Sequence, residues 1–144
     1  MSTPKRKPAA AINYRALAEL RYQIRVFLSF SEQAARAAGI EPQQHQLLLA
    51  LKGLDPEQRP SVGMLASRLL LKHHTVVGLL DRLEAEKLVA RKKSERDGRE
   101  ILIEITPRGE RLLTKLSLAH SRELSSEGGA LLEAMQTLVK ATKR

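Results

Sequence analysis

Residues 72–84 read KHHTVVGLLDRLE and combine a helical apolar pattern with side chains that make directional hydrogen bonds. Three- and four-residue spacing relates Val76, Leu79, Leu80 and Leu83, which predicts a helix that buries this stripe. The opposite face then carries His73, His74, Val77, Gly78 and Asp81, with Thr75 and Arg82 on its flank. Imidazole and hydroxyl groups donate or accept hydrogen bonds, and glycine lets a backbone approach another surface closely. This chemistry suits contact with the base edges of DNA.

Simpler interpretations of the same residues stay open. An outward histidine is otherwise a solvated side chain, and Gly78 is otherwise a packing contact with a neighbouring helix. His73 and His74 are adjacent, so on a helix they point about 100° apart and do not easily share one ion. The remaining histidines are His45 and His120. We therefore expect no metal site and no cofactor.

The charge of the chain is high and unevenly placed. Its 144 residues carry a formal net charge of +9, with a pI near 10.3. Residues 59–99 hold ten Lys and Arg against five Asp and Glu, whereas residues 100–144 are nearly neutral. A localised basic excess indicates an anionic partner such as nucleic acid, although a basic chain can also simply be a soluble one.

Cysteine and hydrophobic runs set further limits. The chain contains no cysteine, which excludes disulfides, thiolate metal sites and thiol oxidation as a switch. The basic N-terminus is not followed by an apolar run, and no segment approaches the ~20 apolar residues of a membrane span. We expect a cytoplasmic protein without a membrane partner.

The remaining sequence predicts four helices, a β-hairpin and two more helices. Helices are expected from about Asn13 to Ala38, from Pro42 through Leu54, from an N-cap at Ser61 through Leu69, over residues 72–84, from Thr106-Pro107 to Gly128-Gly129, and beyond that break. Strands are expected at Leu88–Lys93 and Arg99–Ile105, and Asp97-Gly98 between them is a strong signal for a tight hairpin turn.

Two short helices followed by a basic hairpin form a winged helix-turn-helix. The second helix of this motif fits the major groove of DNA, and the hairpin reaches an adjacent groove or the backbone. Recognition-helix candidates are His73, His74, Thr75, Val77 and Gly78; wing candidates are Lys92, Lys93, Arg96, Asp97 and Arg99; DNA-backbone candidates are Ser61, Arg68, Lys72 and Arg82. The charged hairpin is otherwise a solvated edge that prevents strand addition.

The motif region resembles the MarR-type transcription regulators. The resemblance rests on residues 61–113, with the xLAxxL helix, the TVxxLLDRLExxxLVxR passage, and the RDGR wing followed by ITPRGE. It implies a homodimeric repressor that reads a near-palindromic double-stranded operator and is released by a small aromatic or phenolic effector. It also implies that Asp97 pairs with Arg99 to shape the wing. This chain departs from many members by having Gly98 at the wing tip and Gly78 in the middle of the recognition helix.

The predicted fold is mainly α with a small β-hairpin wing, in which dimerisation helices flank a winged helix-turn-helix. We expect a disordered basic tail over residues 1–11 and one domain over 12–144. Within that domain, residues 12–40 and 107–144 are expected to be the dimerisation helices and residues 42–106 the winged lobe. The flanking helices carry more apolar surface than one small lobe can cover, which favours pairing with a second copy; packing within the monomer is the alternative.

An effector would occupy a mostly apolar pocket with a few polar groups. By location the candidates are Tyr14, Tyr22, Arg25, Phe30 and His45. No paired carboxylates, activated nucleophile, phosphate-binding loop or metal-ligand spacing is present in the sequence, so an enzyme is not expected. The alternative function is a winged-helix module that binds DNA nonspecifically or binds another protein.

Overall fold

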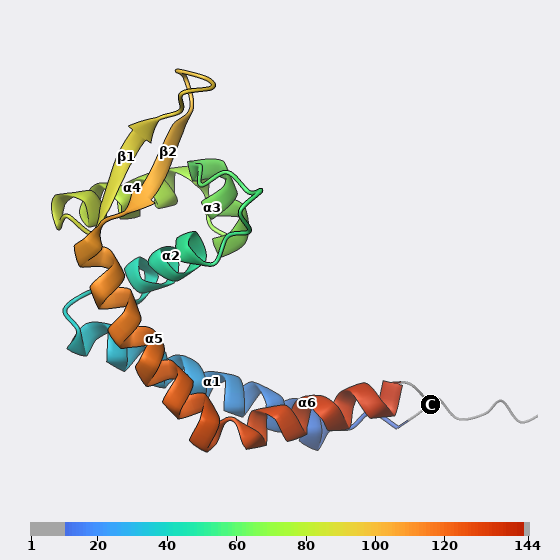
Figure 1. Cartoon of the computed structure of the whole chain (residues 1–144). Coiled ribbons are helices and arrows are strands. Elements are labelled where there is room, and N and C mark those ends of the chain that lie inside the picture. Colours follow the sequence, from blue (N-terminus) through green and yellow to red (C-terminus); the bar gives the residue numbers. More distant parts are fainter. Residues whose placement is uncertain (1–10, 143–144) are drawn as a thin grey trace, which may run out of the picture. The chain divides into compact units, whose positions relative to one another are not determined.

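The computed structural model describes residues 11–142 and divides the chain into two compact units (Figure 1). The winged unit is Phe30–Arg122, and the helical unit comprises the described residues up to Ser29 and from Glu123 onward. Along this part of the chain the elements are α1 (Tyr14–Ala37), α2 (Pro42–Lys52), α3 (Val62–Leu69), α4 (His73–Ala85), β1 (Val89–Lys93), β2 (Ile101–Ile105), α5 (Pro107–Glu127) and α6 (Gly129–Thr142). This order confirms the predicted fold. Except for Ala11, the predicted tail lies outside the described residues.

The core of the winged unit is built from leucine and other aliphatic side chains. The predicted stripe of α4 lies at its centre, since Val76, Leu79, Leu80 and Leu83 are all buried. The cluster also contains Ala35 of α1, Ile40 just before α2, Leu47, Leu48 and Leu51 of α2, Leu65 of α3, Leu88 just before β1, Val89 of β1, Ile103 of β2, and Leu113 and Leu116 of α5. Burial of one stripe on α4 leaves its opposite face outside the core.

Local side-chain chemistry sets the ends of the helices. Ser61 is the N-cap of α3, as predicted, because its Oγ accepts a hydrogen bond from the Met64 N–H at 3.1 Å. Thr106 Oγ1 likewise accepts from the Gly109 N–H at 3.1 Å at the start of α5. Leu70 closes α3 in a left-handed conformation, with φ at 55°, and its backbone N–H returns to the Ala66 and Ser67 carbonyls. This tight junction separates α3 from α4.

The hairpin pairs β1 and β2 antiparallel, with Val89 opposite Ile105 and Lys93 opposite Ile101. The predicted hairpin is confirmed, but its loop covers residues 94–100 rather than the predicted 94–98, and it is closed by the Ser94 N–H donating to the Glu100 carbonyl at 2.8 Å. Asp97-Gly98 instead begins a smaller turn inside that loop, in which the Glu100 N–H donates to the Asp97 carbonyl at 3.0 Å. Burial of Val89 and Ile103 sets the register of the strands, and the loop follows from it.

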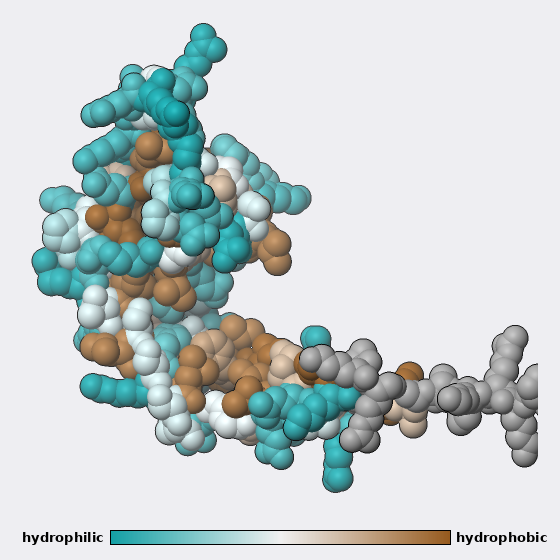
Figure 2. All heavy atoms as spheres, turned by 45° about the vertical axis from the view of Figure 1, so that its right-hand side comes forward, coloured by the Kyte–Doolittle hydropathy of each residue, from teal (hydrophilic) through white to brown (hydrophobic). Residues whose placement is uncertain are grey.

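The helical unit contains the first part of α1, the end of α5, and α6. Asn13 Oδ1 caps α1 by accepting from the Ala16 N–H at 3.0 Å. Gly128 separates α5 from α6, as the Gly128-Gly129 break predicted. Many apolar side chains of this unit are exposed, including Leu17, Ile24, Leu28, Leu124, Leu132, Met135 and Val139. Figure 2 shows hydrophobic surface, in brown, over these helices. None of the helices described is long and apolar enough to cross a membrane.

Candidate nucleic-acid interface

The outward face of α4 is positioned as the sequence predicts. His73 and His74 are exposed in its first turn, and Thr75 and Val77 are half-buried. Lys72 is the N-cap residue but its side chain makes no cap hydrogen bond. The N-terminal turn of a helix presents unpaired N–H groups and partial positive charge, so this end of α4 favours an anion.

Gly78 lies in the middle of this face. Apart from the adjoining backbone of α4, no atom of the described residues lies within 4 Å of where a Cβ at Gly78 would be. The alternative that Gly78 packs against a neighbouring helix of the same chain is therefore wrong. The position leaves the backbone of α4 open to an incoming surface.

An arginine that the sequence reasoning did not single out partly neutralises the acids beside this face. Arg91 on β1 contacts the Asp81 carboxylate through Nη2 at 2.7 Å and the Glu84 carboxylate through Nη1 at 3.3 Å. Its Nη2 also donates to the Val77 carbonyl at 3.4 Å. Arg91 thus ties β1 to α4 and reduces the negative charge that α4 would present to a phosphate. The signal in the sequence was weak, since basic residues occupy three consecutive positions of β1.

The wing places its basic residues at an exposed, hydrophilic tip (Figure 2). Lys93, Arg96, Asp97 and Arg99 are exposed. Lys92 is paired with Glu104 at 2.7 Å, and this carboxylate raises the pKa of the Lys92 amine. Asp97 contacts Arg99 as the resemblance implies, but through the backbone: the Arg99 N–H donates to Asp97 Oδ1 at 3.0 Å. The guanidinium of Arg99 is left out of this contact.

A groove of about 580 Å³ joins these elements on the surface of the winged unit. Its lining combines the start of α3, the outward side of α4 and the base of the wing, namely Ser61, Val62, Gly63, His73, Val77, Asp81, Arg91, Arg99, Glu100 and Ile101. The other backbone-contact candidates, Arg68, Lys72 and Arg82, are exposed on α3, its junction with α4, and α4. The structure thus gathers Ser61, His73, Val77 and Arg99 around one groove.

The effector candidates fall into both units. Tyr14 and Tyr22 lie on α1 in the helical unit with 72% and 57% of their surface exposed, and Arg25 is also exposed there. Phe30 and His45 belong to the winged unit, where both contact His120 of α5, with ring centroids 5.3 Å and 4.9 Å away. The structure therefore brings two of the five candidates together, around a histidine that sequence reasoning had not placed in the site.

His45 is the least satisfied member of this cluster. It is 2% exposed, and within residues 11–142 its Nδ1 atom has no hydrogen-bond partner. Burial lowers the pKa of His45, and the nearby His120 lowers it further. The Leu116 carbonyl can only accept, so His120 Nδ1 donates to it at 2.7 Å, while Nε2 lies 2.8 Å from Ser31 Oγ. His120 is thus held in place, and His45 keeps an unused polar atom.

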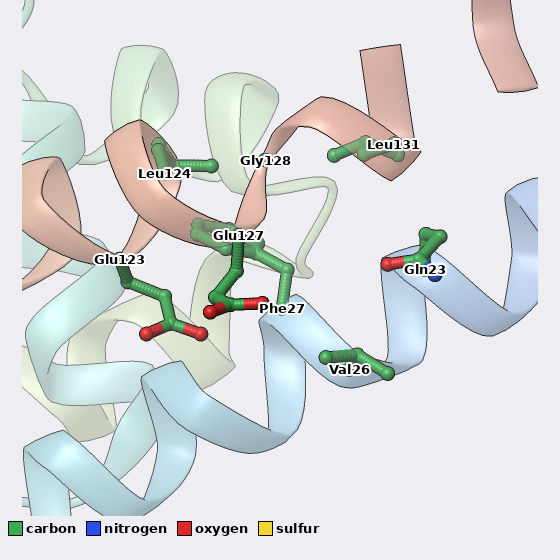
Figure 3. A pocket seen from close by; sticks show the side chains of 8 residues that line it. All are labelled: Gln23, Val26, Phe27, Glu123, Leu124, Glu127, Gly128 and Leu131. Atoms are coloured by element: carbon green, nitrogen blue, oxygen red, sulfur yellow. The ribbon is translucent and has the colours of Figure 1, made fainter. Parts of the chain in front are cut away.

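The helical unit also contains a small cavity between α1 and the α5–α6 break (Figure 3). Its volume is about 20 Å³, enough for a water molecule. Phe27, Leu124 and Leu131 supply apolar walls, and Glu123 and Glu127 lie at its edge. An aromatic effector does not fit this cavity.

Comparison with known proteins agrees with the geometry. The MarR family model matches residues 38–100, from before α2 to the end of the wing loop. A relative from Bacillus subtilis (strain 168), the uncharacterized HTH-type transcriptional regulator YkoM, is 28% identical over 114 residues, which cover 77% of this chain and 72% of that protein.

Solved structures share the fold along nearly the whole chain. MepR, a transcription regulator of the Staphylococcus aureus multidrug efflux pump MepA, gives a TM-score of 0.71 at 22% identity, covering 92% of this chain and 96% of that one. The MepR–DNA complex gives 0.65 at 24% identity, with 92% and 96% covered. CouR from Rhodococcus jostii RHA1, bound to p-coumaroyl-CoA, gives 0.69 at 20% identity, with 94% and 95% covered. The family match over residues 38–100, the related sequence and the common fold agree: this chain is similar to the MarR family and shares the fold of its solved members.

Proposed function

We propose that this protein is a cytoplasmic, sequence-specific regulator that binds double-stranded DNA as a homodimer and represses transcription until a small effector releases it. The observation that carries the DNA-binding part is the outward face of α4, where exposed His73 and His74 and the open Gly78 lie beside a basic wing. The pairing of Asp81 and Glu84 with Arg91 supports it, because it lowers the negative charge that would repel phosphates there. MepR, which has this fold, has been solved with DNA.

In this proposal the first turn of α4 reads base edges, and Gly78 lets the helix lie deep in the major groove. Arg96 and Arg99 of the wing contact an adjacent groove or the backbone, while Ser61, Arg68, Lys72 and Arg82 contact phosphates. Each phosphate neutralised steepens the dependence of log K on log salt by about 0.9.

A second copy of the chain is the proposed partner of the helical unit. Its exposed leucines, Met135 and Val139 form more apolar surface than a monomer usually leaves in water. Pairing would cover that surface and present two copies of α4 to a near-palindromic operator, with half-sites about one helical turn apart.

The effector part of the proposal is supported by the His45 cluster. A phenolic hydroxyl can donate a hydrogen bond to the unpartnered Nδ1 of His45, and Phe30 and His120 provide ring surfaces beside it. CouR, bound to p-coumaroyl-CoA, is a protein of this fold with a phenolic ligand. The test is release of the protein from its operator by a panel of hydroxybenzoates and hydroxycinnamates. His45→Gln is expected to weaken the response, and Arg111→Lys, at an exposed site on α5, is expected to leave it intact.

The deciding experiment measures binding of the purified protein to duplex DNA from its own upstream region, with a scrambled duplex of equal length as control, over a salt titration. The proposal expects a preference of ~100-fold or more, salt-sensitive affinity, and one dimer per site. Equal affinity for all duplexes, after selection from random DNA has also failed to find a preferred site, would instead favour nonspecific binding. Absence of DNA binding would favour a protein-interaction module.

A further inference from the structure

The loop between α2 and α3 is joined to the wing through one arginine. Arg59 Nη2 donates to Ser94 Oγ at 2.8 Å and contacts the Glu100 carboxylate at 2.9 Å. Ser94 and Glu100 are the first and last residues of the wing loop. The Arg59 guanidinium therefore holds the two ends of this loop together from outside the hairpin.

Ser94 passes this contact on to the tip of the wing. It is 5% exposed, although the loop that follows it is exposed. Its Oγ accepts from the backbone N–H of Arg96 at 3.2 Å and more weakly from that of Asp97 at 3.4 Å. Within Ser94–Glu100, the backbone of Arg96 is thus held by the same hydroxyl that Arg59 holds.

The neighbours of Arg59 fix the same loop to the rest of the winged unit. The Pro60 carbonyl accepts from the Ile103 N–H at 2.8 Å, and Ser61 forms a bridge with Leu102. Ser61 is also the N-cap of α3. Residues 59–61 consequently connect the start of α3 with β2 and with the wing loop.

We propose that Arg59 is a positioning residue: through Ser94 and Glu100 it holds the wing loop so that Arg96 and Arg99 meet DNA in one orientation. This inference rests on the proposed DNA binding. A loop that is already ordered in the free protein loses less conformational entropy on binding than a loose loop does, which favours the complex. The Glu100 carboxylate neutralises the Arg59 charge, so the role of Arg59 is geometric.

Lysine in place of Arg59 separates this role from direct phosphate contact. Arg59→Lys keeps the charge, but its shorter side chain does not place a nitrogen where Nη2 of Arg59 contacts both Ser94 and Glu100. If Arg59 positions the loop, Arg59→Lys should bind DNA nearly as weakly as Arg59→Gln. If Arg59 contacts a phosphate, Arg59→Lys should bind DNA as the unmodified protein does. Ser94→Ala removes the shared acceptor without changing the charge. Arg111→Lys, at an exposed site on α5, is the matched control.

The first measurement is amide hydrogen exchange on the free, full-length protein. Arg59→Lys and Ser94→Ala should each speed exchange at the Arg96 and Asp97 amides by about tenfold or more. Ser94→Ala removes the hydroxyl that accepts their hydrogen bonds, and Arg59→Lys no longer fixes that hydroxyl in place. Exchange at Leu80, in the core, should stay as in the unmodified protein and thereby report that the variants are folded. Unchanged exchange at Arg96 in Arg59→Lys would overturn the inference.

The second measurement is operator affinity of the same variants. Arg59→Lys, Arg59→Gln and Ser94→Ala should each weaken binding by about tenfold, and the double variant at 59 and 94 should be little worse than either single one. A positioning role is contradicted if Arg59→Lys binds the operator as tightly as the unmodified protein. It is also contradicted if amide exchange in the wing loop becomes faster without any loss of operator affinity. If the unmodified protein does not bind DNA, the proposed function fails and the positioning role fails with it; the exchange data then still show whether the network itself exists.

Discussion

Gly78 is the residue at which folding and the proposed DNA binding make opposite demands. Glycine inside a helix costs about 0.5–1 kcal/mol relative to alanine, and at this site a Cβ would meet no other atom of the described chain. Nothing in the packing of the winged unit accounts for the glycine. In the proposed function, close approach of DNA to the α4 backbone accounts for it.

Gly78→Ala is therefore expected to stabilise the protein by about 0.5–1 kcal/mol and to weaken operator binding by about 1 kcal/mol or more. Urea denaturation measures the first effect and a DNA titration the second. Gly129→Ala, at an open site at the start of α6, is the control and should leave DNA affinity unchanged. Unimpaired operator binding by Gly78→Ala would remove the glycine from the interface.

His45 makes the stability of the protein depend on pH. Burial holds its folded-state pKa below the usual value of 6.5, so above that value the side chain is neutral in both folded and unfolded chains. As the pH falls from 6.5 toward the lower folded pKa, the unfolded chain takes up a proton first, and stability is lost. Denaturation midpoints at pH 7.5 and 5.5 should therefore differ more in the unmodified protein than in His45→Gln. If the two differ equally, His45 is not the titrating group.

At the scale of elements, Gly109 shows how closely α5 begins against the hairpin. A Cβ at this site would lie 2.2 Å from the Leu88 carbonyl oxygen and 2.9 Å from Ile105 Cγ2. Thr106 joins the same junction, because its Oγ1 donates to the Lys87 carbonyl at 2.7 Å. The glycine of the ITPRGE segment is required by this close approach.

Gly109→Ala should lower the free energy of unfolding by about 1–3 kcal/mol, because the hairpin backbone must move away from α5. Urea denaturation followed by circular dichroism measures this loss. Gly129→Ala again provides the comparison, with no loss expected. Equal stability of the two variants would show that the junction can relax.

The elements themselves were largely predictable because their signals are local. The α4 stripe, the Ser61 cap and the Gly128-Gly129 break each depend on residues within a few positions of one another. The wing loop is longer than predicted because its length is set by the register of the strands. That register depends on the burial of Val89 and Ile103 and on the hydrogen bond from the Ile103 N–H to the Pro60 carbonyl. Contacts such as Arg59 with Ser94, or His45 with His120, join residues far apart in sequence and leave no periodic signal.

At the scale of the whole molecule, the exposed apolar residues of the helical unit are the main feature that a single chain leaves unexplained. Leu132 on α6 is 59% exposed, and Met135 and Val139 follow it at helical spacing. The sequence predicted this surplus from the number of apolar residues on the flanking helices. The sequence pattern does not identify the partner that covers this surface, because a leucine stripe has the same spacing whether it is exposed or buried.

Leu132→Arg is expected to weaken dimerisation by more than ~100-fold, since an unpaired charge would be buried on association. Sedimentation velocity over a range of protein concentrations measures the change. Thr137→Arg adds the same charge at an exposed polar position of α6 that points away from the Leu132, Met135 and Val139 side, and it should leave the dimer intact. A Leu132→Arg protein that remains dimeric would place the dimer interface elsewhere.

The placement of the tyrosines has an optical consequence. The chain has no tryptophan and two tyrosines, Tyr14 and Tyr22. Both lie on α1 within the helical unit and both are exposed in the single chain. Near-ultraviolet emission of the protein therefore originates on that helix, while the winged unit contributes no phenol or indole. Dilution of the unlabelled protein should report association of the helical unit through its own tyrosine emission, with no dye attached to the surface that contacts DNA.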